Sequence, residues 1–121
     1  MSDSYSKPVL YLFKTNFSDP QHKGERFFCP FCTHVEGMMS VFPVIRQEIE
    51  VRYVGFEKPR GDLDMLCGEA NQSCPQLIFP DGDDAISSDY SIPGTGKVKR
   101  IDRTLSILDY FASKFDLAKR H

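Results

Sequence analysis

The first hydrophobic segment of the chain is a continuous run, without alternation of polar and apolar residues. The residues 9–13, which follow Pro8, are all apolar, and such a short run predicts a buried strand. The next segment, 14–26, is rich in Asn, Ser, Asp, Pro and Gly, which is the composition of a loop. We therefore expect a strand over 8–13 followed by a long connection.

Helical spacing of apolar residues begins after Cys29. The residues that share one face of this predicted helix are Cys32, Val35, Met38, Met39 and Phe42. Pro30 suits the first turn, where its missing N–H leaves no bond unmade, and Pro43 ends or kinks the helix. The following residues, 49–56, alternate in a way that predicts a second strand.

The second half of the chain carries shorter signals. The segment 59–68 predicts a short helix with Asp62 as its N-cap, and the segment 76–79 predicts a third strand. Pro80-Asp81-Gly82-Asp83 has the chemistry of a hairpin turn, so we expect a return strand over 85–88.

A Gly-rich loop, 91–96, precedes the last predicted helix, for which Asp102 is a candidate cap. The apolar face of that helix is expected to contain Ile101, Leu105, Leu108, Phe111 and Phe115. The order is then β-α-β-α-β-β-α in a single domain of 121 residues, with an α/β fold in which helices flank a mixed four-stranded sheet. The first βαβ unit should place its two strands in parallel.

Composition and charge exclude several classes of function. The net charge of -2 gives no basic field for nucleic acid, and we expect the short basic cluster 97–100 to be solvated surface. No apolar run approaches the roughly 18 residues of a membrane span. The polar N-terminus has no signal-peptide pattern, so a cytoplasmic location is expected. Oligomeric state is not indicated.

The strongest candidate chemistry is the pair Cys29 and Cys32 at the start of a helix. The first N–H groups of a helix lack partners and its dipole is positive there, so a thiolate is favoured at Cys29. A thiolate attacks disulfides, and Cys32, one turn further and more buried, could resolve the resulting mixed disulfide. Reduced thiols are the rule in the cytosol, which makes a catalytic or metal-binding role more probable than a structural disulfide.

Other interpretations of these residues stay open. The two cysteines could be core residues that happen to be close. They could also bind zinc together with His22 and His34, or zinc or an iron–sulfur cluster with Cys74 as a third soft ligand. A third alternative is a non-catalytic binding module on the same fold, because fold does not determine function.

Two stretches resemble the thioredoxin-like superfamily. Cys29-Pro30-Phe31-Cys32 resembles the Cys-Pro-Tyr-Cys motif of glutaredoxins, and 73–77 resembles the loop that carries a cis-proline in that fold. The resemblance implies a thioredoxin-like fold and a cis peptide bond between Cys74 and Pro75. It also implies that the backbone at Cys74 and Pro75 faces the dithiol and binds the substrate peptide or glutathione.

The segment 75–89 also resembles the N-terminal domain of glutathione transferases, with Pro75, Leu77, Asp81-Gly82 and a later serine. This resemblance implies that Ser87 or Ser88 helps to hold the γ-glutamyl carboxylate of glutathione. No bound cofactor is expected, and glutathione would be a co-substrate. The expected partners are a small thiol or a protein disulfide.

A further resemblance covers most of the chain. It is to an uncharacterised bacterial family assigned to the thioredoxin-like superfamily, which has no assigned activity. The segments that carry it are 28–32, 36–37, 42–43, 59–60 and 68–73. The sequence as a whole therefore predicts a thiol-disulfide oxidoreductase that uses Cys29 and Cys32.

Overall fold

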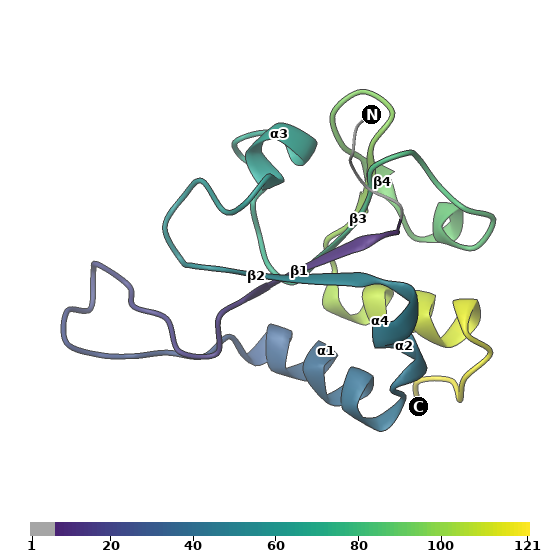
Figure 1. Cartoon of the computed structure of the whole chain (residues 1–121), viewed down its shortest axis with the longest axis horizontal. Coiled ribbons are helices and arrows are strands. Elements are labelled where there is room, and N and C mark those ends of the chain that lie inside the picture. The colour runs from purple at the N-terminus through teal and green to yellow at the C-terminus, as the bar shows by residue number, and fades with distance from the viewer. Residues whose placement is uncertain (1–6) are drawn as a thin grey trace.

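A mixed five-stranded sheet organises the computed structural model, which describes residues 7–121. Helices flank the sheet, with α1, α2 and α4 on one face and α3 on the other (Figure 1). The strands are β1 (Val9–Phe13), β2 (Glu50–Val54), β3 (Gln76–Phe79), β4 (Ile92–Pro93) and β5 (Lys99–Ile101). The helices are α1 (Pro30–Val41), α2 (Val44–Glu48), α3 (Leu63–Cys67) and α4 (Thr104–Lys114), with a 3-10 turn η1 (Ser87–Asp89). Within residues 7–121, no helix is long and apolar enough to cross a bilayer.

The centre of the sheet is formed by β1 and β3. The strand order is β2-β1-β3-β5-β4, in which β1 and β2 run parallel and the other pairs run antiparallel. In the register of β1 and β3, Val9 lies opposite Ile78 and Tyr11 lies opposite Gln76. The C-terminal end of β1 and the N-terminal end of β3 therefore lie side by side at the same end of the sheet.

Alternate residues of the central strands pack into two separate cores. Leu10 and Leu12 of β1 contact the cluster formed with α1 and α4, whereas Val9 and Tyr11 contact the cluster formed with α3. This alternation follows from the two-residue period of a strand, which sends successive side chains to opposite faces. Because both faces are covered, the continuous apolar run of β1 is buried as the sequence predicted.

Several predicted elements are confirmed, and two are shorter than expected. Strand β1, helix α1 and strand β3 lie within one residue of their predicted positions. Strand β2 covers only Glu50–Val54 of the predicted 49–56, and the unpredicted helix α2 precedes it directly. Helix α3 spans five residues, and the Asp62 that precedes it makes no capping hydrogen bond through its side chain.

The predicted return strand over 85–88 is wrong, and the sheet has five strands instead of four. The carboxylate of Asp84 accepts hydrogen bonds from the backbone N–H groups of Ile86 and Ser87, at 2.8 and 2.6 Å. These local bonds hold the backbone in turns and in η1, which competes with pairing along a strand. The strand that pairs with β3 is β5, and β4, which lies in the predicted 91–96 loop, pairs with β5 at the edge.

The basic cluster 97–100 is not solvated surface as predicted, because its second half forms strand β5. Arg100 is buried, and its Nε donates to the carbonyl of Pro93 at 2.9 Å. Its Nη1 donates to Gln76 Oε1 and to Asp102, both at 3.2 Å. These partners satisfy the guanidinium group and allow a charged side chain to lie in the sheet.

The last helix begins later than predicted, and its buried face is different. Ile101 belongs to β5, so α4 starts at Thr104 after Arg103 as its cap residue. The buried residues of α4 are Ile107, Tyr110, Phe111 and Ala112. Leu105, which the sequence placed in the core, is 47% exposed.

We expect Ile107→Ala to destabilise the protein by about 2–5 kcal/mol, because it removes a fully buried side chain and leaves a cavity. The matched control Leu105→Ala should cost about 0.5 kcal/mol or less, because that side chain is largely solvated. Urea unfolding of both variants measures the difference. An equal loss of stability in the two variants would contradict the register of α4 described above.

Candidate functional site

Cys29 is the residue that caps the N-terminus of α1. Its backbone is extended, Pro30 occupies the first turn, and the N–H of Cys32 donates to the Cys29 sulfur at 3.2 Å. The side chain of Cys29 therefore takes the position of a capping oxygen and satisfies one of the free N–H groups of the helix. The Cys29 sulfur therefore lies beside a backbone N–H donor at the positive end of the helix dipole.

Cys32 lies one turn further along α1 and is more deeply enclosed. Its side chain is 4% exposed, and its sulfur accepts the backbone N–H of Phe13 at 3.4 Å. Burial raises the pKa of the Cys32 thiol well above its usual range, so this group is protonated at neutral pH. Cys29 is 9% exposed, and both cysteines are free thiols in the structure.

The predicted cis peptide bond between Cys74 and Pro75 is present, and it lies at the dithiol. The thiol of Cys29 donates to the backbone carbonyl of Cys74 at 3.8 Å. Cys74 itself is half-buried, and burial raises the pKa of its thiol to about 12. The structure therefore brings together four of the predicted site residues, which are Cys29, Cys32, Cys74 and Pro75.

Arg60 is a charged residue of this site that the sequence analysis did not single out. Its guanidinium group lies over the rings of Phe13 and Phe56, with 4.7 and 4.9 Å to the ring centroids. It also donates to the carbonyls of Phe56 and Gln72, at 2.6 and 2.9 Å. Arg60 thus connects the end of β1 to the segment that leads into Cys74. The only sequence signal was its place in the 59–60 segment of the family resemblance.

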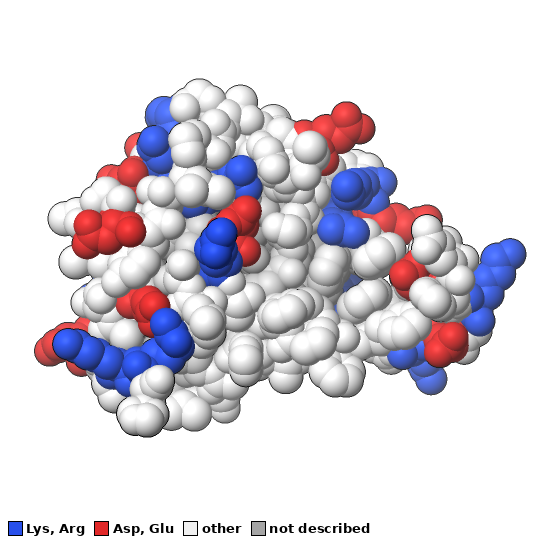
Figure 2. Space-filling model, turned by 180° about the vertical axis from the view of Figure 1, so that it is seen from behind, with Lys and Arg blue, Asp and Glu red and all other residues white. Residues whose placement is uncertain are grey.

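The long connection between β1 and α1 forms an arm, residues 14–28, that projects from the end of the sheet (Figure 1). Phe17 and Phe27 pair across its base, and the ring of Phe17 stacks on Phe56 at 5.4 Å. Charges of both signs are interspersed on the arm and on the body in the view of Figure 2. Next to Cys29, the rings of Phe28 and Phe31 are 63% and 60% exposed. An apolar surface therefore flanks the thiol.

Ser87 and Ser88 are not brought to the dithiol. They follow the C-terminal end of β3, whereas Cys74 and Pro75 precede its N-terminal end. The hydroxyl of Ser87 is buried and donates to Asp83 at 2.9 Å, and Ser88 is exposed. The glutathione contact that the transferase resemblance implied for these serines therefore has no counterpart near Cys29.

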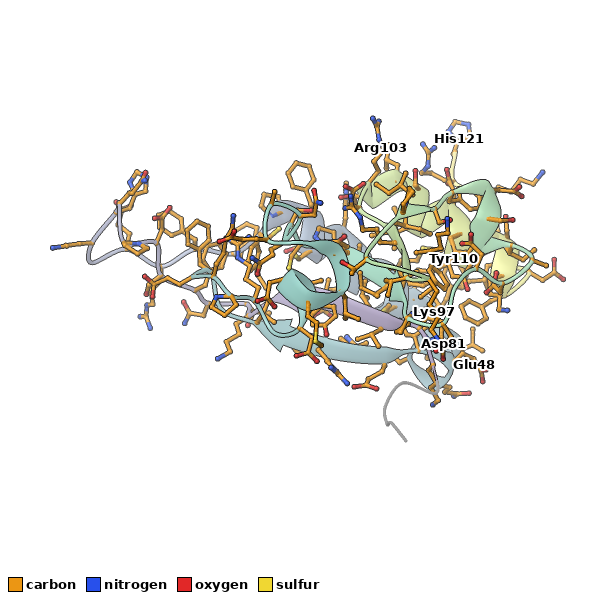
Figure 3. The ribbon with its side chains drawn as sticks, turned by 90° about the horizontal axis from the view of Figure 1, so that it is seen from above. Glu48, Asp81, Lys97, Arg103, Tyr110 and His121 are labelled. Carbon is orange, nitrogen blue, oxygen red and sulfur yellow. The ribbon has the colours of Figure 1, made fainter. Side chains whose placement is uncertain are left out.

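A cavity of about 590 Å³ lies at the end of the sheet opposite the dithiol. Its lining includes Glu48, Asp81 and Tyr110, which Figure 3 shows at the end of the molecule away from the arm. Lys97 pairs with Asp81 at 3.1 Å beside it. This cavity and the cysteine pair are separate features of the molecule.

The histidines weighed as metal ligands do not join the cysteines in a cluster. His22 is on the arm, where its ring meets Phe27 edge-on at 5.7 Å, and His34 is exposed on α1. Among residues 7–121, no three His, Cys, Asp or Glu side chains are grouped in a way that could hold a metal ion.

The fold and the site define an α/β protein with a cysteine pair at a helix N-terminus, in contact with the backbone before a cis-proline. The model of one protein family, described as protein of unknown function DUF3088, matches residues 7–119, and the chain belongs to that family. No curated protein and no solved structure gives a significant match to the chain.

We expect Cys29 to be alkylated first when the native protein is treated with iodoacetamide near neutral pH. Burial raises the pKa of Cys67 to about 11 and that of Cys74 to about 12, and raises that of Cys32 further. A raised pKa lowers the reactive thiolate fraction at neutral pH by about tenfold per unit. Mass spectrometry of digested samples over time gives the order of modification.

The same pKa shifts predict the pH dependence in a Cys29→Ser variant. The alkylation rates of Cys67 and Cys74 should still rise between about pH 9 and about pH 10. The alkylation rate of an ordinary cysteine levels off above about pH 8.5. A rate that levels off near the ordinary value for either residue would contradict its burial in the folded protein.

Proposed function

We propose that this protein is a thiol-disulfide oxidoreductase with a thioredoxin-like fold, and that Cys29 and Cys32 are its redox pair. One observation carries the proposal: the Cys29 sulfur lies between the N–H of Cys32 and the carbonyl of Cys74, directly before a cis-proline. The fold assignment is supported by the β1-α1-β2 unit with parallel strands and by β3 and β5, which run antiparallel beside it.

In the proposed reaction, the Cys29 thiolate attacks one sulfur of a substrate disulfide. The substrate S–S bond breaks, a mixed disulfide forms on Cys29, and the first substrate thiolate leaves and takes up a proton. Cys32 then loses its proton and attacks the Cys29 sulfur, which releases the second substrate thiol. The substrate gains two electrons and the cysteine pair becomes a disulfide.

The environments of the two cysteines support this division of roles. The Cys29 sulfur accepts an N–H group at the N-terminus of α1, a position where helices stabilise negative charge, and we assign it the attacking role. Cys32 is protonated and enclosed, because burial raises its pKa, and this limits its reaction with external disulfides. Cysteines three positions apart at a helix start are compatible with disulfide geometry.

A second thiol substrate is needed to return the pair to its reduced form. We propose a small thiol such as glutathione, two molecules of which would supply the two electrons and leave as their disulfide. The backbone of Cys74 and Pro75 is the proposed contact for the substrate, and the exposed rings of Phe28 and Phe31 offer it an apolar surface. Such a cycle suits the cytoplasmic location expected from the sequence, where thiols are kept reduced.

Cys29→Ser should abolish the reduction of insulin and of a small mixed disulfide, because it removes the attacking sulfur. The matched control is Cys67→Ala, which alters a cysteine buried on the other face of the sheet and should retain activity. Both variants are compared with the wild-type protein, with dithiothreitol or glutathione as the reductant.

The wild-type pair should also oxidise reversibly, with a midpoint between about -120 and -270 mV, the range of known dithiol proteins. Equilibration in glutathione redox buffers, followed by alkylation of the remaining thiols, measures it. An absence of reversible oxidation would reject the redox function and favour a non-catalytic binding module.

A further inference from the structure

We propose that Cys74 is a second resolving thiol of this site, so that a mixed disulfide on Cys29 can be resolved by Cys32 or by Cys74. The proposal rests on the oxidoreductase function proposed above and adds a second oxidised state, in which Cys29 is linked to Cys74. Three features of the structure support it: the contact between the two residues, the surroundings of the two resolving thiols, and the position of Arg60.

Cys29 and Cys74 meet directly although 45 positions separate them in the sequence. The Cys29 thiol donates to the carbonyl of Cys74 at 3.8 Å, so the sulfur of one residue lies against the backbone of the other. Both residues also pack against the cluster formed by α1, α4 and the sheet. The antiparallel pairing of β1 and β3 supports this arrangement, because it places the start of β3 beside the end of β1, and the N–H of Phe13 in β1 donates to the Cys32 sulfur of α1.

The two candidate resolving thiols differ in how they are enclosed. The Cys32 sulfur is nearly inaccessible and accepts an N–H bond from Phe13. Cys74 is only half-buried, lies at the end of the sheet and packs against both core clusters. Cys74 is therefore the more exposed of the two residues beside Cys29.

Arg60 provides a positive charge for Cys74. Its guanidinium group is held by the rings of Phe13 and Phe56 and by the carbonyl of Gln72, two residues before Cys74. Its charge lowers the pKa of the Cys74 thiol, which partly opposes the larger effect of burial. A cation near a thiol increases its thiolate fraction and so its rate of attack.

Resolution by Cys74 would follow the same thiol-disulfide exchange as resolution by Cys32. The Cys74 thiol loses its proton to solvent and attacks the Cys29 sulfur of the mixed disulfide. The bond between Cys29 and the substrate breaks, the Cys29–Cys74 bond forms, and the substrate thiolate leaves and is protonated. The substrate disulfide is the oxidant, and no other co-reactant is required.

Cys67 provides the matched control for Cys74. It is buried in the cluster on the α3 face, together with Leu63 and Leu66, and does not belong to the cluster that contains Cys29. Its thiol pKa is also raised by burial. A general reactivity of buried thiols would therefore affect Cys67 and Cys74 alike, whereas a resolving role would be specific to Cys74.

The test uses two variants, C32S/C67A and C32S/C74A, and the aromatic disulfide 5,5′-dithiobis(2-nitrobenzoate), which releases a coloured thiolate at each exchange. In C32S/C67A, attack of Cys29 on the reagent should release one equivalent of the coloured thiolate. Attack of Cys74 on the resulting mixed disulfide should release a second equivalent. This second release should be at least about tenfold faster than in C32S/C74A, because the reaction is intramolecular. Mass spectrometry should find peptides joined through Cys29 and Cys74, and C32S/C74A should retain the mixed disulfide on Cys29.

The wild-type protein separates the failure of this inference from the failure of the proposed function. One outcome overturns only the role of Cys74: wild type forms the Cys29–Cys32 disulfide, but the mixed disulfide on Cys29 lasts as long in C32S/C67A as in C32S/C74A. The proposed redox pair is retained in that case. If wild type forms no internal disulfide, both proposals fall. Circular dichroism of each variant establishes that it is folded.

Discussion

The antiparallel pairing of β1 with β3 is the constraint on which the site depends. It brings the end of β1, from which the arm leads to Cys29, beside the start of β3, which Cys74 and Pro75 precede. Neither segment carries the chemistry alone, because Cys29 obtains one contact from its own helix and the other from Cys74. Both faces of the two strands are buried, and each buried side chain of β1 packs in one of the two cores.

The electrostatics of the cysteines follows from the same arrangement. Cys29 is at the N-terminus of α1, where the N–H of Cys32 donates to its sulfur. The thiols of Cys32 and Cys74 are buried, and burial raises their pKa. The three cysteines of the site therefore have different surroundings, because their hydrogen-bond partners and their burial differ. Arg60 modifies this pattern at Cys74, and the aromatic rings around Arg60 fix its position.

Local patterns predicted much of the fold and the centre of the site. The apolar run of β1, the spacing from Cys32 to Met39 and the proline at the first turn of α1 each depend on neighbouring residues, and each is confirmed. The second half was less predictable because long-range or competing contacts decide it. Asp84 holds a turn where a strand was expected. Arg100 is accommodated in the sheet by an ion pair with Asp102 and by hydrogen bonds to Gln76 and to the carbonyl of Pro93. The glutathione contact that the transferase resemblance implied for Ser87 or Ser88 is not formed at the dithiol, because these residues follow the far end of β3 and lie in η1.

Arg60 shows why a site residue of this kind escapes sequence analysis. Its position depends on Phe13 at the end of β1, Phe56 after β2 and Gln72 before β3, which come together only when the sheet has formed. A lone arginine in the loop between β2 and α3 gives no periodicity and no motif, whereas a cysteine pair with a proline between them gives both. The residues that perform the proposed exchange could thus be recognised from local sequence, and those that adjust it required the tertiary structure. A role for Cys74 as a resolving thiol combines both kinds of inference, because a resemblance in the sequence placed Cys74 at the dithiol and the tertiary structure supplies its contact with Cys29.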